Sequence, residues 1–289
     1  MKTILTNRDV AVLVDVYKFR YLSAAQVEAL HFPSQRTAYR RLQTLRDGKY
    51  LKAFTVQGVS GRIFHLDTYG AAVVAESMQV DIDDLQWNRE MRAPKDYYFL
   101  RHFMAINDFR IALTLSCQNT AINLLGFIPE YIGEKTDKGN VKKYLRDNVN
   151  DISDSLKQIS HTPDAAFALE KDGNAALFFV EIDRGVETVS DPQKGVLKSI
   201  VFYLNYFVAG KFNRYEQDFK REFKTFRSLL VTSSPKRLQN IRKAATTYQF
   251  PKKQVKRFLW GATDIDKNTI FSPVWQSLDA NDETRYKIG

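Results

Sequence analysis

In the first 75 or so residues, the spacing of apolar residues changes from a helical period to a strand period in a definite order. This order constrains the fold more than any other feature. Three segments place apolar side chains on one helical face, and two later segments have the pattern of strands. These segments are residues 6–18, 23–31, 35–47, 51–56 and 62–66. Gly58 and Gly61 lie between the two strands, where a hairpin has to turn, and Thr68 begins a fourth helical pattern. The order predicts three helices followed by a hairpin.

The third helix combines a buried apolar face with an outward face that suits DNA. Residues 31–52 contain six Lys or Arg and one acid, Asp47. Arg and Gln side chains can bond base edges in the major groove, and further basic side chains neutralise phosphates. The pattern therefore predicts a winged helix-turn-helix that binds double-stranded DNA. The residues expected to contact DNA are Gln35, Arg36, Thr37, Arg40 and Gln43, with Arg62 at the hairpin.

Two alternatives to DNA binding stay open at this point. A small helical domain with a solvated basic face would show the same charges, and so would a winged helix that binds protein. Winged helices often dimerise, so a homodimer is a further expectation, although the chain has no long heptad repeat.

The whole chain is basic, with 43 Lys and Arg against 33 Asp and Glu and a formal net charge of +10 over 289 residues. Such an excess favours a polyanionic partner, nucleic acid before an anionic membrane. The most apolar stretch, residues 200–209, is shorter than the roughly 20 residues that span a bilayer. The N-terminus does not resemble a signal peptide, and the single cysteine, Cys117, excludes an internal disulfide and is expected in a core. We therefore expect a cytoplasmic protein without a membrane partner.

The remaining patterns predict a second domain and an α+β fold class for the chain. Residues 1–79 form the winged helix-turn-helix, residues 80–95 a linker and residues 96–289 the second domain. That domain is expected to contain, in order, a helix, three strands, a helix, a strand, a helix and a strand. The segments are residues 96–118, 122–128, 163–169, 176–183, 192–209, 228–232, 235–247 and 257–261, with a further helix over 215–224. Residues 134–160 are charged and poor in apolar residues, which predicts a loop or insertion.

Acidic side chains occur where the second domain's core strands end. Asp164 follows Pro163, and Glu181 and Asp183 close a run that is apolar on both faces. Side chains two apart on a strand share a face, about 7 Å apart at ~3.3 Å per residue. The turn at Asp172 brings Asp164 beside them if the two strands pair. Crowded carboxylates repel each other, and a divalent cation such as Mg²⁺ relieves the repulsion. The three carboxylates are therefore a predicted metal site for phosphodiester chemistry.

These motifs carry a resemblance to known families. A Pro-Asp strand end, a hairpin and then Glu181-Ile182-Asp183 resemble the PD-(D/E)XK fold of restriction endonucleases, whose core has the order αβββαβ. The chain over roughly residues 6–260 resembles the replication-relaxation family of plasmids and other mobile elements, with a His102–Arg110 segment and a Phe179–Gly185 segment as its motifs. This family is similar to the relaxases of the MOBC class. The resemblance implies site-specific nicking of DNA with Mg²⁺ or Mn²⁺ in mobilisation or replication.

One position departs from the endonuclease motif, because Asp183 stands where the motif has Lys. Lys198, on the following helix, is a substitute for that lysine or an ordinary surface lysine, and Lys194 is a weaker choice. The acids also have a structural interpretation, in which Asp164 caps a turn and Asp183 pairs with Arg184 or a helix terminus. The sequence thus leaves two hypotheses open, a nickase and a non-enzymatic DNA-binding regulator or initiator with a silent nuclease-like domain. An assembly factor is a third.

The histidines and the remaining motifs narrow the chemistry. His102 is a candidate general base or water-positioning residue, with a structural core histidine as the alternative, and His161 is assigned to the loop entering the site. No two histidines are two residues apart and no phosphate-binding P-loop is present, which disfavours His-x-His relaxase and P-loop helicase mechanisms. Residues 235–257 hold eight basic residues and no acid, so this stretch is a candidate phosphate-tracking surface.

Overall fold

The structure is a computed structural model that describes residues 4–87, 97–135, 140–250 and 258–289. It divides into two compact units, Met1–Ile111 and Ala112–Gly289, and each is described by itself. Both units mix helices and strands. None of the helices in the described ranges has the length and apolar character needed to cross a membrane.

The N-terminal unit contains the three helices and the hairpin that the sequence predicts, together with one short strand that it does not. The sheet has three antiparallel strands in the order β1-β3-β2. The elements are α1 (Asn7–Phe19), β1 (Leu22–Ser23), α2 (Ala24–His31), α3 (Gln35–Asp47), β2 (Leu51–Phe54), β3 (Ile63–Leu66), α4 (Thr68–Met78) and the 3₁₀ turn Ile82–Asp84. The predicted linker, residues 80–95, lies partly outside the described residues.

Local sequence signals set the starts of these helices. Thr6 and Asp9 form a capping box at the start of α1, and Ser23 and Gln26 form a second one at the start of α2. The hydroxyl of Ser34 accepts a hydrogen bond from the backbone N–H of Thr37 at the start of α3. These caps satisfy backbone groups that a helix end leaves without partners. The helix boundaries are therefore close to those predicted.

Helix α5 (Tyr97–Gln118) crosses the boundary between the two units. The sequence places this whole helix in the second domain, whereas the structure assigns its residues up to Ile111 to the first unit. The buried amide of Asn107 donates hydrogen bonds to the carbonyls of Phe19 and Tyr21, at 3.1 and 2.7 Å. Burying these polar groups requires such bonds, which hold the helix against the N-terminal unit.

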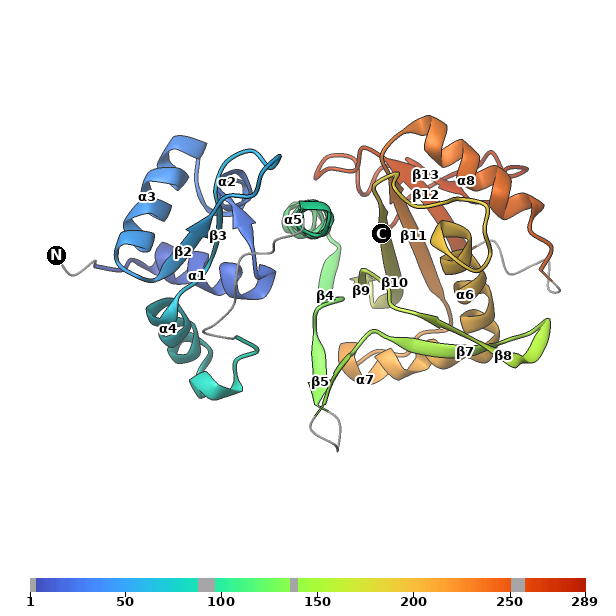
Figure 1. Cartoon of the computed structure of the whole chain (residues 1–289), viewed down its shortest axis with the longest axis horizontal. Coiled ribbons are helices and arrows are strands. Elements are labelled where there is room, and N and C mark those ends of the chain that lie inside the picture. Colours follow the sequence, from blue (N-terminus) through green and yellow to red (C-terminus); the bar gives the residue numbers. More distant parts are fainter. Residues whose placement is uncertain (1–3, 88–96, 136–139, 251–257) are drawn as a thin grey trace. The chain divides into compact units, whose positions relative to one another are not determined.

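The C-terminal unit is built on a mixed sheet of seven strands in the order β14-β13-β12-β11-β10-β9-β4 (Figure 1). Strands β10, β11 and β12 are parallel, and the other neighbours are antiparallel. The strands are β4 (Asn123–Pro129), β9 (Ala165–Lys171), β10 (Asn174–Asp183), β11 (Phe226–Thr232), β12 (Leu259–Thr263), β13 (Trp275–Ser277) and β14 (Arg285–Tyr286). β13 and β14 were not predicted.

Aromatic packing between the sheet and its helices forms the core of this unit. α6 (Gly195–Ala209) and α8 (Pro235–Thr247) cover one face of the sheet (Figure 1). On that face, Phe179 of β10 contacts the rings of Tyr203, Tyr206 and Phe226, with centroids 5.1–5.9 Å apart. The predicted helix over 215–224 is shorter, with α7 spanning Tyr215–Phe219 after a 3₁₀ turn (Lys211–Arg214). Alternation along β10 thus directs its odd-numbered side chains toward α6 and α8.

The prediction of a loop over residues 134–160 is wrong for the described part of that segment. The chain forms two hairpin ladders, β5 (Gly133–Lys135) with β6 (Val141–Lys143) and β7 (Asp147–Asp151) with β8 (Asp154–His161). Leu145, Val149 and Ile159 are buried in the same core as α6. These three apolar residues are widely spaced among charged and polar ones, so the segment lacks the apolar content that usually marks strands.

Candidate functional site

Helix α3 separates its side chains into a buried face and a solvent face. Ala38, Leu42 and Leu45 are fully buried. On the solvent face, four side chains of the first two turns are exposed, and none of these four is acidic. They are Gln35, Arg36, Tyr39 and Arg40. Because this face carries two guanidinium groups and one amide, it can present bidentate donors to a polyanion.

The other three predicted DNA-contact residues take part in local hydrogen bonds. The Oε1 atom of Gln43 accepts a hydrogen bond from Arg62 Nη1 at 3.0 Å, which joins the hairpin to α3. The Nε2 atom of Gln43 is buried and has no hydrogen-bond partner among the described residues. The Thr37 hydroxyl lies 3.0 Å from that of Ser34. Gln43 and Arg62 therefore form a linked polar pair at the edge of the exposed face, and Thr37 supports the helix start.

Tyr39 is a residue that the sequence interpretation did not select. Its side chain is exposed at 40%, between Arg36 and Arg40 on α3. An exposed aromatic ring beside arginines can stack on a base or pack along a sugar. The sequence did contain a signal that could have identified this residue, namely a tyrosine that lies outside the apolar stripe of a basic helix.

A buried hydrogen-bond network surrounds Glu181 in the C-terminal unit. Its Oε1 atom lies 2.7 Å from His161 Nε2 and accepts a hydrogen bond from the Tyr203 hydroxyl. Burial lowers the pKa of His161, but the neighbouring Glu181 carboxylate outweighs this and raises the pKa above its ordinary value. Burial and the same carboxylate raise the pKa of Tyr203 well above its ordinary value. His161, assigned by the sequence to a loop, thus lies at the end of β8 against a predicted site residue.

Asp164 and Lys198 belong to the same neighbourhood. Asp164 lies just before β9, and its Oδ2 atom accepts a hydrogen bond of 2.7 Å from the backbone N–H of Ile182. Its negative charge also raises the pKa of His161, after the larger effects of burial and Glu181, whereas the positive charge of Lys198 opposes this increase. The structure therefore brings together Asp164, Glu181, His161 and Lys198, three of which the sequence selected as site residues.

Asp183 has a different environment from the other two acids. Arg237 of α8 donates two hydrogen bonds to its carboxylate, at 2.8 and 2.9 Å, and the Thr232 hydroxyl donates a third at 2.7 Å. Its side chain is only 2% exposed. Burial disfavours the charged carboxylate, but the bonds from Arg237 and Thr232 hold its pKa below the ordinary value. The sequence considered Arg184 or a helix terminus as the structural partner, and the structure shows Arg237 instead.

The three carboxylates of the predicted metal site have different surroundings. Within the described ranges, no group of three or more His, Cys, Asp or Glu side chains is arranged to hold a metal ion. Asp183 is directed to Arg237, while Asp164 and Glu181 lie on neighbouring strands that pair through Ala165 and Val180. Mg²⁺ often uses one or two carboxylates and takes its other ligands from water and substrate phosphate. Because Arg237 binds Asp183, Asp164 and Glu181 are the two predicted ligands that would be left for such an ion.

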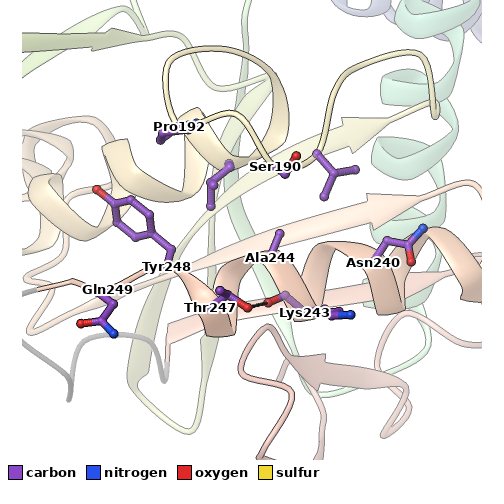
Figure 2. A pocket seen from close by; sticks show the side chains of 10 residues that line it. Ser190, Pro192, Asn240, Lys243, Ala244, Thr247, Tyr248 and Gln249 are labelled. Carbon is purple, nitrogen blue, oxygen red and sulfur yellow. Dashed lines mark hydrogen bonds between the residues drawn. The ribbon is translucent and has the colours of Figure 1, made fainter.

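A pocket of about 600 Å³ lies between the chain after β10 and helix α8 (Figure 2). Val189, Pro192 and Leu197 line one side, and Ala244 and Tyr248 line the other. Polar side chains of α8 and the residues after it lie around it, as Figure 2 shows for Asn240, Lys243 and Gln249. The four basic residues of the predicted phosphate-tracking surface that follow α8 (Lys252, Lys253, Lys256 and Arg257) lie outside the described residues.

Two further residues named by the sequence have other surroundings. His102 is half-buried on the part of α5 that belongs to the N-terminal unit, and its catalytic role stays a prediction. Cys117 is half-buried rather than fully buried, and burial raises the pKa of its thiol to about 11. A thiol with so high a pKa is mostly protonated near neutral pH, so it is a poor nucleophile.

Comparison with known proteins places the chain in context. The family model for replication-relaxation proteins matches residues 13–221, which is more than half of the chain. The match runs from α1 to the end of α7 and includes α3, Asp164, Glu181 and Asp183. No curated protein and no solved structure matches the chain.

Proposed function

Because the chain belongs to the replication-relaxation family, we propose that it binds double-stranded DNA and acts in the replication or mobilisation of a plasmid or other mobile element. The family membership suggests the biological setting. The DNA-binding activity is inferred from the N-terminal unit. The exposed face of α3 is the single observation that carries it.

The topology of the N-terminal unit supports a winged helix-turn-helix. Its order is α1, β1, α2, α3 and then the hairpin of β2 and β3, with β1 paired to β3. In such domains the helix before the hairpin enters the major groove. Here that helix is α3, whose first two turns expose Arg36 and Arg40, while its one acidic residue, Asp47, lies in the last turn and pairs with Arg46. We therefore assign α3 as the recognition helix and the hairpin as the wing.

Removing a guanidinium from α3 is expected to lower the affinity for DNA and to reduce the preference for the cognate sequence. A bidentate contact between an arginine and a guanine contributes about 1–3 kcal/mol of discrimination. Arg36→Ala and Arg40→Ala are each expected to reduce the affinity for the cognate duplex by about 5- to 150-fold. Fluorescence anisotropy with a labelled duplex from the element's own origin region, and with a shuffled duplex, measures both affinity and preference.

Arg46→Ala is the matched control, because Arg46 lies in the last turn of the same helix and pairs with Asp47 at 2.7 Å. It is expected to bind almost as the unaltered chain does. Equal affinity for both duplexes, together with unchanged binding by Arg36→Ala and Arg40→Ala, would refute α3 as the recognition helix.

Metal-dependent nicking is the second candidate function, and the neighbourhood of Asp164 and Glu181 is the observation that favours it. The order α5, β4, β9, β10, α6, β11 follows the helix–three strands–helix–strand core of restriction-endonuclease-like domains that the sequence resembles. Asp164 and Glu181 are the residues that would hold Mg²⁺ or Mn²⁺. A bound ion of this kind would supply Lewis-acid stabilisation at a phosphodiester.

The other residues of this neighbourhood have roles that need no metal. Lys198 can attract a phosphate toward the two carboxylates, and its half-buried position on α6 limits its movement. His161 and Tyr203 orient the Glu181 side chain through their hydrogen bonds. Asp183 is assigned a structural role, because its carboxylate is bound by Arg237 and Thr232.

Substituting the paired acids is expected to abolish nicking if this second function is present. Supercoiled DNA carrying the element's own origin is incubated with the chain and Mg²⁺ or Mn²⁺, and open circles are quantified on a gel. Asp164→Asn and Glu181→Gln are expected to leave the DNA supercoiled. Asp172→Asn, in the exposed turn between β9 and β10, is the matched control and is expected to nick normally.

The outcome separates this candidate from the non-enzymatic alternative. Failure of the unaltered chain to nick with either metal, or nicking by both acid variants at the normal rate, would assign the C-terminal unit to a silent nuclease-like domain. The DNA-binding proposal does not depend on this result, because it is measured by anisotropy.

A further inference from the structure

The N-terminal unit contains a second feature that the six expected DNA-contact residues do not account for. A pocket of about 730 Å³ lies between the first turn of α1 and one face of α3. α1 contributes Arg8 and Asp9, and α3 contributes Thr37, Arg40 and Arg41. Arg40 and Arg41 come three and four residues after Thr37, so both lie next to it on one helical surface.

The charges in this pocket do not balance. Three guanidinium groups face one carboxylate, that of Asp9, which is 1% exposed. Arg41 binds both oxygens of Asp9, with Nε at 2.6 Å from Oδ1 and Nη2 at 2.5 Å from Oδ2. Burial opposes ionisation of Asp9, but the bonds from Arg41 and Thr6 hold its pKa below the ordinary value. The Arg41–Asp9 pair is therefore neutral as a unit, and the positive charges of Arg8 and Arg40 remain.

Neither of the two remaining arginines has an acidic partner within the described ranges, and Arg8 is restrained by a ring contact. Both side chains are exposed, and neither is ion-paired within the described ranges. The guanidinium carbon of Arg8 lies 5.2 Å from the centre of the Phe32 ring, a cation–π contact that restrains the side chain. Two positioned guanidinium groups at one pocket suit a phosphate group, whose oxygens accept several charge-assisted hydrogen bonds.

We infer that this pocket binds a phosphate group of the DNA backbone next to the base pairs that α3 reads. The inference rests on the proposed DNA-binding function and adds Arg8 to the residues that contact DNA. Thr37 and Arg40 belong both to the pocket and to the expected DNA contacts, so an anion bound there lies beside the groove-facing side chains. A backbone contact of this kind sets the position of the helix on the duplex and carries no sequence information.

The test measures the salt dependence of DNA binding by the full chain. Each phosphate contact contributes about 0.9 to the slope of log affinity against log salt concentration. Arg8→Gln is expected to reduce the magnitude of that slope by about one. It is also expected to weaken binding of the origin duplex and binding of the shuffled duplex by the same factor. Arg8→Lys keeps the charge and is expected to retain the slope. Lys18→Gln removes one exposed positive charge from the last turn of the same helix, and it is expected to leave the slope unchanged.

The outcomes distinguish this inference from the function on which it rests. If Arg8→Gln keeps the slope of the unaltered chain while Arg36→Ala still weakens binding, the pocket inference is wrong and the recognition helix stands. If neither the unaltered chain nor its variants bind the origin duplex more tightly than the shuffled duplex, the proposed recognition of DNA is wrong, whatever the role of the pocket. A separate calorimetric titration with inorganic phosphate addresses the source of the anion. Tight binding of free phosphate, with no effect of Arg8→Gln on the DNA slope, would assign the pocket to a free phosphate compound and overturn the inference.

Discussion

Replacing Arg237 with alanine is expected to reduce the free energy of unfolding of the C-terminal unit by about 3–5 kcal/mol, because it leaves a buried charge without its counter-charge. The Asp183 side chain is 2% exposed and receives two of its hydrogen bonds from this guanidinium. Among the residues that the structure describes, the Thr232 hydroxyl and the backbone N–H of Gly185 would remain as its donors. The same arginine also binds the carbonyl of Glu187, so the chain after β10 loses an anchor.

Hydrogen exchange of the amides in β10 and β11 is the appropriate measurement, because it reports opening of this sheet in the full chain. Arg221→Ala is the matched control, since Arg221 forms an exposed pair with Glu170 at 2.6 Å, and little change in protection is expected. The double variant Asp183→Asn with Arg237→Ala removes both charges and is expected to recover part of the lost stability. Unchanged protection in Arg237→Ala would mean that the pair does not hold the strand ends.

Acidification from pH 6.5 to pH 4 is expected to destabilise the N-terminal unit through His65. Burial, and to a smaller extent the nearby positive charge of Lys52, lower the pKa of this histidine from 6.5 to about 4. In this window the unfolded chain binds a proton that the folded unit does not, so stability decreases as the pH decreases. The loss reaches about 3 kcal/mol at pH 4, at about 1.4 kcal/mol for each unit of pKa shift.

The surroundings of His65 explain why protonation is costly. The residue is 5% exposed on β3, and its ring lies near those of Tyr21 and Phe54, with centroids 6.1 and 5.6 Å apart. Its Nδ1 atom is buried and has no hydrogen-bond partner in the part of the chain that the structure describes. A second proton on the ring would therefore be buried without an acceptor.

His65→Phe keeps an aromatic ring in this position and removes the titration. The protection of the amides in β2 and β3 against hydrogen exchange is measured at neutral and at acidic pH. On acidification, this protection is expected to fall more steeply in the unaltered chain than in this variant. Equal pH dependence in the two chains would show that groups other than His65 cause the acid sensitivity. The difference between the chains isolates the contribution of His65.

The reassignment of Asp183 changes the interpretation of the acidic motif. In the sequence, three acids near two strand ends look equivalent, because nothing local distinguishes a carboxylate that binds a metal from one that binds an arginine. Arg237 is 54 residues away from Asp183 in the chain, and only the packing of α8 on the sheet brings the two together. Asp164 and Glu181 remain as a neighbouring pair, so the hypothesis of a nuclease site now depends on two acids and Lys198.

Local signals in the sequence predicted the helix starts and the hairpins, because caps, turn residues and side-chain periodicity act over a few residues. Thr6 with Asp9 and Ser23 with Gln26 illustrate this, and so does the turn at Asp172 and Gly173 between β9 and β10. The same signals missed β13, β14 and the ladders within residues 134–160. These strands are short or highly charged, and their pairing partners supply stabilisation that the local sequence does not show.

The sequence by itself determined the helices and the hairpin of the N-terminal unit, the basic outward face of α3 and the positions of Asp164 and Glu181 at strand ends, since each depends on spacing within one element or one hairpin. Only the tertiary structure decided how those side chains are used. It joined Asp183 to Arg237, surrounded Glu181 with His161 and Tyr203, and left Arg8 and Arg40 as uncompensated charges beside the Arg41–Asp9 pair. The physical reason is that charge compensation and burial depend on which distant segments pack together.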